Sequence, residues 1–240
     1  MEQWIYKEMF HLEDKHWRYA ARRQIIATVL KTLALPASPK IVEIGSGTGG
    51  NLHMLAQFGQ VEAIEPNSEG REFIKQRGFT VQDGLLPDQM PIPPESVDMV
   101  AMLDVLEHVD NDAASLKTVH SLLKKGGYLV LTVPAFPSLW SYHDKQRHHH
   151  RRYTKQQLKT LCLAAGFAIE KFSYYNALLF PVVVGVRFLN KLLGRHDSSD
   201  EKLPSNRTNA VLQAVFASER HWLKRASLPI GVSLLVVLRK

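Results

Sequence analysis

The chain of 240 residues contains one cysteine, Cys162. A lone cysteine excludes an intramolecular disulfide and any zinc site built from several cysteines, and it fits a reducing compartment. No run of apolar residues reaches the roughly 18–20 that a transmembrane helix needs. The first residues, MEQWIYKEMFHLEDKHW, carry acidic side chains where a secretory signal would have a basic segment followed by an apolar one. We therefore expect a cytoplasmic protein.

Positive charge is scarce in the first half of the chain and abundant in the second. Residues 1–120 contain 11 Lys and Arg against 17 Asp and Glu, whereas residues 121–240 contain 19 against 6. A basic second half suits an anionic substrate, a phosphorylated lipid carrier, a membrane surface or nucleic acid, although a solvated basic face explains it equally well.

Short apolar segments alternate with amphipathic ones along most of the chain. The segments predicted as strands are 40–45, 61–65, 79–82, 97–103, 128–133, 167–174 and 230–238. The segments predicted as helices are 16–35, 49–58, 68–76, 111–123, 154–165 and 208–226. Such alternation predicts an α/β fold, in which helices cover both faces of an open, mostly parallel sheet. Ligands of these sheets bind at the carboxyl ends of the strands.

A chain of this length is most simply one domain, 1–240, with additions. We expect residues 1–36 to form an N-terminal helical cap. About 55 residues separate Tyr174 from Ile230, at the ends of the last two predicted strands. This spacing predicts a helical insertion over residues 176–228.

A glycine-rich turn follows the first predicted strand, in the stretch Lys40–Asn51, KIVEIGSGTGGN. Gly45, Gly47 and Gly49 permit backbone conformations that other residues resist, and they let a ligand approach the main chain closely. A helix beginning near Thr48 would aim its unpaired N–H groups over the turn. The turn therefore predicts a nucleotide-type binding site.

The turn alone does not identify the nucleotide. Gly45, Gly47 and Gly50 satisfy G-x-G-x-x-G, and Glu65 follows Gly45 by 20 residues, where a dinucleotide fold places its ribose-binding acid. Glu43, however, stands inside the strand two places before the first glycine. A carboxylate there disfavours a pyrophosphate and suits a cationic ligand.

Two further features follow the third and fourth strands. Asp83 lies just past the third strand, within Gln82-Asp83-Gly84, and the run 103–109, LDVLEHV, follows the fourth. Together with the glycine turn they resemble the class I S-adenosylmethionine-dependent methyltransferases, in the group that includes the ubiquinone-biosynthesis methylases. The resemblance covers about residues 40–135. Beyond them, the segment His148–Thr154, HHHRRYT, looks like one found in many bacterial members.

The resemblance implies a Rossmann-like sheet of seven strands in the order 3-2-1-4-5-7-6, the last strand antiparallel, and S-adenosylmethionine as cofactor. Glu43 would help to orient its methionyl part, Glu65 would hold the ribose hydroxyls, and Asp83 would read the adenine. The full set of expected cofactor-binding residues is Glu43, Gly45, Ser46, Gly47, Thr48, Glu65, Pro66, Asp83, Gly84, Leu85, Asp104 and Val105.

Methyl transfer requires a base only where the acceptor must lose a proton. His108, just past the fourth strand, is the first candidate because an ordinary histidine titrates near neutral pH. Its alternative is a packing or helix-capping histidine. His143 and Asp144, in the loop after the fifth strand, are the second candidates.

The same loop is rich in histidine and arginine. Its cluster, His143, Asp144, His148, His149 and His150, could be read as a metal site. Adjacent loop histidines point in different directions and no helical i, i+4 pair is present, so we expect no metal. Arg147, Arg151 and Arg152 instead suit an anionic part of the substrate, or salt bridges that pin the loop. The residues expected at the substrate are Trp17, Tyr142, His148 and Arg152.

The insertion begins with the apolar stretch 176–194, NALLFPVVVGVRFLNKLLG. This composition suits a lid over a hydrophobic acceptor or a helix on a membrane surface, and we expect a peripheral membrane contact through 176–194 as one of its roles. A packed helix pair or a dimer contact explains it equally well, so the chain is expected to be a monomer or a homodimer.

The leading hypothesis is an enzyme that transfers a methyl group from S-adenosylmethionine to a small molecule, with an apolar, lipid-linked or anionic acceptor. The alternative is a non-catalytic module that binds S-adenosylmethionine or a partner. A nucleic-acid substrate is not expected, because the chain contains neither a recognisable nucleic-acid-binding module nor an Asn/Asp-Pro-Pro-aromatic motif after the fourth strand.

Overall fold

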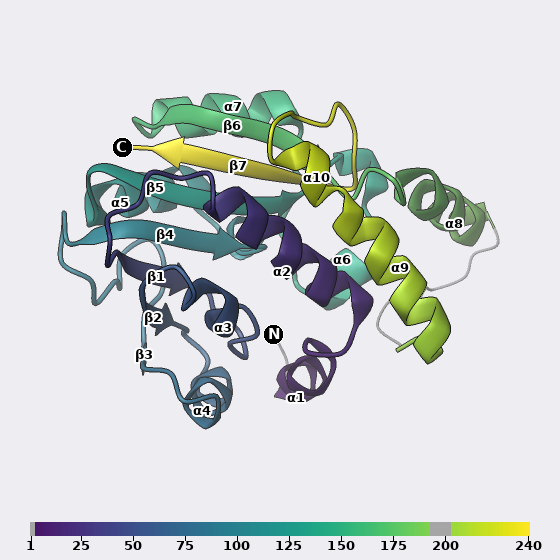
Figure 1. The fold of residues 1–240 in the computed structure, drawn as a ribbon, viewed down its shortest axis with the longest axis horizontal. Coiled ribbons are helices and arrows are strands. Elements are labelled where there is room, and N and C mark those ends of the chain that lie inside the picture. Colours follow the sequence, from purple (N-terminus) through teal and green to yellow (C-terminus); the bar gives the residue numbers. More distant parts are fainter. Residues whose placement is uncertain (1–2, 193–202) are drawn as a thin grey trace.

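The seven strands form one sheet in the order β3-β2-β1-β4-β5-β7-β6 in a computed structural model that describes residues 3–192 and 203–240 (Figure 1). The strands are β1 Lys40–Ile44, β2 Gln60–Ile64, β3 Val81–Gln82, β4 Val97–Leu103, β5 Leu123–Pro134, β6 Ala168–Tyr175 and β7 Ser233–Arg239. β7 runs antiparallel to both of its neighbours, whereas the other pairs are parallel. The predicted fold and strand order are confirmed.

Helices cover both faces of the sheet. They are α1 Gln3–Leu12, α2 Trp17–Leu30, α3 Leu52–Leu55, α4 Ser68–Gln76, α5 Asp112–Leu122, α6 Tyr142–Gln146, α7 Lys155–Ala164, α8 Phe180–Leu192, α9 Asn206–Ser218 and α10 Arg220–Leu223. The helices α5 and α7 lie on one face, and α2, α9 and α10 cross the other (Figure 1). No helix in the described ranges is both long and apolar enough to cross a membrane.

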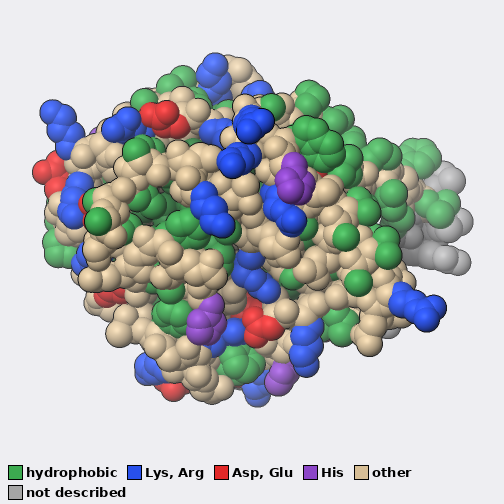
Figure 2. Space-filling view, viewed as in Figure 1, with side chains coloured by type: hydrophobic (Ala, Val, Ile, Leu, Met, Phe, Trp, Pro, Cys, Tyr) green, Lys and Arg blue, Asp and Glu red, His purple; other side chains and the backbone are tan. Residues whose placement is uncertain are grey.

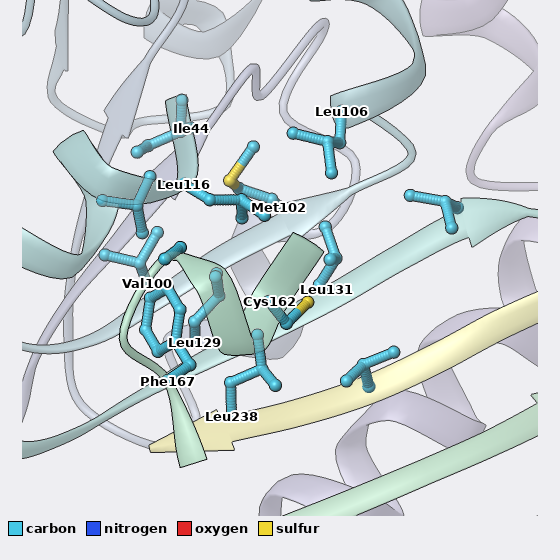
Figure 3. Packing of buried hydrophobic residues seen from close by; sticks show 14 of the residues in the cluster. Ile44, Val100, Met102, Leu106, Leu116, Leu129, Leu131, Cys162, Phe167 and Leu238 are labelled. Carbon is cyan, nitrogen blue, oxygen red and sulfur yellow. The ribbon is translucent and has the colours of Figure 1, made fainter. Parts of the chain in front are cut away.

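Each face of the sheet has its own hydrophobic core. On the α5 and α7 side, Met102 and Leu131 of the central strands pack with Leu116 and Cys162 (Figure 3). On the other side, Ile25 of α2 and Phe216 of α9 pack against residues of β4, β5 and β7. β4 is buried on both faces, which explains why its sequence is almost continuously apolar.

Two of the predicted helices have wrong bounds. The helix after the glycine turn begins at Leu52 rather than near Thr48, because Gly49 has φ +83° and cannot continue a right-handed helix. The helix α5 agrees with its predicted bounds to within one residue at each end, and Lys124 of β5 binds Asp98. The helix predicted over 208–226 is two helices, α9 and α10. The sequence analysis did not predict α1 as a separate helix.

The insertion between β6 and β7 packs on the N-terminal helices. The backbone N–H of Trp17 donates to the Asn209 side chain at 2.9 Å, and the rings of Trp17 and Phe216 lie 6.0 Å apart. At its base, the fully buried Glu219 accepts hydrogen bonds from the N–H groups of Ala177 and Leu178, at 2.7 and 2.9 Å. Glu219 therefore ties the end of α9 to the start of the insertion. Residues 193–202 of the insertion lie outside the described ranges.

We expect Glu219→Ala to lower the free energy of unfolding by about 1–3 kcal/mol, because two partly buried N–H groups lose their acceptor. Urea denaturation followed by circular dichroism measures the loss. Glu170→Ala is the matched control, since Glu170 is exposed in β6 and its ion pair with Arg239 is worth about 0–1 kcal/mol. Equal unfolding free energies for the two variants would contradict the anchoring role.

Candidate functional site

The glycine turn lies at the carboxyl end of β1. Gly45, Gly47 and Gly49 all have positive φ, at +69°, +58° and +83°. A Cβ on Gly45 would lie 2.8 Å from both methyl carbons of Val105, which follows β4. The turn therefore requires glycine for its conformation and for the close approach of the two strand ends.

A cavity of about 390 Å³ opens beside this turn. One wall comes from the ends of β1 and β4, with Gly45, Ser46, Gly47 and Asp104. A second comes from α2, a third from the loop around α6, and a fourth, mostly apolar, from α8 and α9. The N-terminal cap, the insertion and the loop after β5 thus meet around one space at the carboxyl ends of the strands.

Eight of the residues expected at the site line this cavity: Trp17, Gly45, Ser46, Gly47, Asp104, His108, His143 and Arg152. The other expected residues do not: Glu43, Thr48, Glu65, Pro66, Asp83, Gly84, Leu85, Val105, Asp144, Tyr142 and His148. Most of the second group lie in β1 or just after β1, β2 and β3, where the resemblance expects the cofactor. Tyr142 and His148 are exposed on the loop around α6.

Glu43 is buried beneath the turn. Its Oε1 accepts a hydrogen bond from the Asn51 side chain at 2.8 Å, while its Oε2 has no hydrogen-bond partner in the described ranges. Burial raises the pKa of Glu43 to about 8, and the bond from Asn51 opposes this shift. The chain thus holds a carboxyl group behind the cavity wall with one oxygen unused.

Glu65, at the end of β2, is also buried but fully engaged. It accepts hydrogen bonds from the Gly47 N–H at 2.7 Å, from the Asn67 N–H at 3.0 Å and from the Tyr6 hydroxyl at 3.1 Å. Burial raises its pKa, and the backbone bonds oppose this. The contact with Tyr6 places α1 over the glycine turn, where Met9 also meets Gly47.

Asp83 behaves differently, since its side chain is 69% exposed and pairs with Arg71 at 3.1 Å. The neighbouring Leu85 forms a two-residue bridge with Gln89 and is exposed too. The adenine side of the expected site is therefore open to solvent, in contrast to the buried Glu65.

Asp104 follows β4 with φ +62° and faces the cavity. It forms a short ion pair with Arg22 of α2 and accepts a hydrogen bond from Thr132 at 2.9 Å. Arg22 is a site residue that the sequence analysis missed, because nothing local to α2 shows which carboxylate it meets.

The loop after β5 is held by a buried ion pair. The Asp144 carboxylate accepts a hydrogen bond from Arg152 Nε at 2.8 Å and bonds His149 Nδ1 at 2.9 Å. These contacts hold the pKa of Asp144 well below its usual range despite burial. Arg152 also donates to the Ala135 carbonyl at 3.1 Å, so its guanidinium holds the loop against the end of β5.

Two histidines of the cavity, His108 and His143, have lowered pKa values. Burial lowers the pKa of His108 to about 3, with the nearby His149 adding to the effect. Burial and the charges of Arg18 and Arg147 hold the pKa of His143 well below its usual range. The expectation that His108 titrates near neutral pH is therefore wrong, and both rings are neutral at physiological pH.

Two cavity residues beyond the expected set stand out. Glu107 is fully buried at the end of β4, and His149 packs edge-on against His108 with ring centroids 4.7 Å apart. Both belonged to segments that the sequence singled out. Their proximity depends on how the loop folds back onto β4, which no spacing in the sequence predicts.

We expect the stability cost of Glu43 to depend on pH. Its folded-state pKa is raised to about 8, so between pH 4.5 and 8 the folded chain binds more protons than the unfolded chain, and stability falls as pH rises. Glu43→Gln should therefore raise Tm above the wild-type value at pH 8.5, by at least about 2–4 °C. At pH 4, where Glu43 is largely protonated in both the folded and the unfolded chain, the two values should nearly coincide.

Differential scanning calorimetry at the two pH values measures these shifts. Glu62→Gln on β2 is the control, since Glu62 is partly exposed and paired with Lys40. A Glu43→Gln effect that is the same at both pH values would contradict the assignment.

Comparison with known proteins matches residues 16–171 to the family model described as a methyltransferase domain. A demethylmenaquinone methyltransferase from Tropheryma whipplei is 29% identical over 124 residues, which cover 50% of this chain and 48% of that protein. A dimethylglycine N-methyltransferase from Parasynechococcus marenigrum is 30% identical over 150 residues, covering 54% and 53%. The chain thus spans about half the length of the curated relatives it matches.

Solved structures agree over the whole chain. A SAM-dependent methyltransferase from Thermotoga maritima superposes with a TM-score of 0.61 at 23% identity, covering 100% of both chains. An S-adenosylmethionine-dependent methyltransferase from Mesorhizobium loti gives 0.62 at 16% identity, covering 95% of this chain and 100% of that one. The chain therefore belongs to the methyltransferase-domain family, with the fold of the S-adenosylmethionine-dependent methyltransferases that its motifs resemble.

Proposed function

We propose that this chain transfers a methyl group from S-adenosylmethionine to a small-molecule acceptor. The observation that carries the proposal is the glycine turn at the carboxyl end of β1, between the buried carboxyl groups of Glu43 and Glu65 and beside a cavity of about 390 Å³. A cationic ligand near the unused Oε2 of Glu43 would favour the ionised carboxylate, whereas a pyrophosphate would disfavour it.

The residues around the turn fit this cofactor. The Gly45–Gly47 backbone would lie along its methionyl part, Glu65 would accept hydrogen bonds from the ribose hydroxyls, and Asp83 would accept one from the adenine amino group. S-adenosylmethionine supplies a methyl group activated by a sulfonium. The chain itself positions the two reactants and excludes water, for which the walls from α2, α8 and α9 are suited.

The acceptor side of the cavity combines apolar and basic groups. Leu179, Val183 and Phe216 form the apolar wall, and Arg147 and Arg187 also face the space. This composition favours an acceptor with an apolar body and an oxygen-rich or anionic end. The curated relatives are named for demethylmenaquinone and for dimethylglycine, of which only the first has a large apolar body. The apolar wall of the cavity favours the first type of acceptor.

Calorimetry with S-adenosylmethionine and with NAD tests the cofactor. We expect binding of the first alone. Gly45→Ala should weaken it at least tenfold, because a Cβ there meets Val105. Gly185→Ala on α8, where a Cβ meets nothing within 4 Å, is the matched control.

Radiolabelled cofactor with a lipid-plus-soluble extract of the source cell then tests the transfer. Label in an extracted small molecule supports the enzyme. Cofactor binding with no labelled product in any fraction would favour the non-catalytic module, and no binding at millimolar S-adenosylmethionine would overturn both.

We further propose that α8 contacts an anionic membrane surface, from which an apolar acceptor reaches the cavity. Val182 and Val186 lie on the cavity side, yet α8 also leaves hydrophobic side chains in solvent, with Phe188 69% exposed. Figure 2 shows hydrophobic side chains gathered at the right-hand end of the molecule, where Figure 1 places α8. The excess of Lys and Arg in the second half of the chain would favour anionic lipid.

Phe188→Asp should reduce cosedimentation with phosphatidylglycerol vesicles about tenfold or more, because burying a phenylalanine is worth about 1.5–3 kcal/mol. The matched control is Val211→Asp on α9, which introduces the same charge at a side chain that is 61% exposed. Equal binding by the two variants, or no binding by the wild type, would contradict the membrane contact.

A further inference from the structure

Three side chains of the cavity bring potential metal ligands together. One ligand atom from each of Glu107, His108 and His149 lies within 4.8 Å of the other two. Glu107 and His108 belong to the 3₁₀ turn Leu106–His108 that follows β4, and His149 comes from the loop between α6 and α7. All three line the cavity.

Glu107 is the least satisfied member of this cluster. It is fully buried, and neither carboxylate oxygen makes a hydrogen bond to another residue of the described ranges. The two arginines whose charges act on it already have partners, since Arg22 pairs with Asp104 and Arg152 with Asp144. A buried carboxylate without a partner is costly, so Glu107 must either stay protonated or face a cation.

His149 is oriented as a metal ligand would be. Its Nδ1 lies 2.9 Å from Asp144 Oδ1, which leaves Nε2 as the ring atom free for the cluster. Asp144 is itself held by Arg152 Nε and by the Ser141 N–H, both at 2.8 Å. A carboxylate behind a histidine in this way fixes the ring and its tautomer, the arrangement that commonly supports metal-bound histidines.

We propose that Glu107, His108 and His149 bind one divalent first-row transition-metal ion at the acceptor end of the cavity. Two histidines and one carboxylate leave coordination positions open. The sequence analysis expected no metal because it considered only residues of the loop, whereas Glu107 and His108 come from the turn that follows β4.

The role of the ion rests on the proposed function. Open positions that face the cavity would bind the acceptor through an oxygen atom and lower the pKa of a bound hydroxyl group. The substrate class is therefore an apolar small molecule that carries a hydroxyl, rather than an amine.

Titration of untagged, EDTA-treated protein with Co²⁺ tests the site, with calorimetry and visible absorption as readouts. The wild type should bind one Co²⁺ per chain with micromolar or tighter Kd. Glu107→Gln and His149→Ala should each weaken binding at least tenfold, and Asp144→Asn roughly 10–100-fold. His53→Ala on α3, away from the cluster, should bind like the wild type. Thermal unfolding of every variant confirms that it is folded.

Glu107→Gln keeps the size and shape of the side chain, so its result is decisive. Wild-type affinity for Co²⁺ in this variant, or no binding by the wild type at millimolar Co²⁺, would overturn the metal site and leave the cluster as packed rings beside a protonated carboxyl. Calorimetry with S-adenosylmethionine on the same samples separates the two proposals. Cofactor binding without Co²⁺ binding removes the metal site alone, and the reverse removes the proposed function alone.

Discussion

The parallel pairing of β1 with β4 is the constraint on which the site depends. β2 and β3 lie on one side of this pair and β5, β7 and β6 on the other, so the chain connections leave β1 and β4 in opposite directions. A crevice opens at the carboxyl ends of such a pair. The turns after the two strands touch there, and Gly45 meets Val105 so closely that no side chain fits between them.

The buried carboxyl groups on the two sides of this crevice have different bonding partners. On the β2 side, Glu65 accepts hydrogen bonds from two backbone N–H groups. These bonds fix its carboxyl group, as a side chain that orients ligand hydroxyl groups requires. Toward β5, Asp104 and Asp144 are each matched to an arginine. Glu43 and Glu107 have oxygens without partners, one on each side of the turn. Since unpaired buried carboxyls destabilise a fold, a cation or a hydrogen-bonding ligand at either position would stabilise the chain.

A structural feature could be predicted from the sequence where neighbouring residues determine it. The apolar run of β4 and the cap at Thr154 act within a few residues, so β4 was predicted to the residue and α7 to within one residue at each end. The strand order was implied by the resemblance to the class I S-adenosylmethionine-dependent methyltransferases. The contact of Glu107 with His149, and of Tyr6 with Glu65, joins segments more than 40 residues apart. Composition and spacing contain no information on such contacts, and for the same reason α1 was missed.

The N-terminal helix α1 adds an energetic link between the cap and the cofactor side. Tyr6 donates to Glu65, and Glu13 bonds both Thr48 and Arg77, so α1 is fastened across the glycine turn. A ligand whose hydroxyl groups reach Glu65 must replace the hydrogen bond from Tyr6. The observed affinity of that ligand is then its affinity for the opened site reduced by the cost of releasing α1. Because α1 also contributes Met9 to the cavity wall, the same release changes the space beside the acceptor. A cofactor held at Glu65 and an acceptor in the cavity would therefore be coupled through one helix.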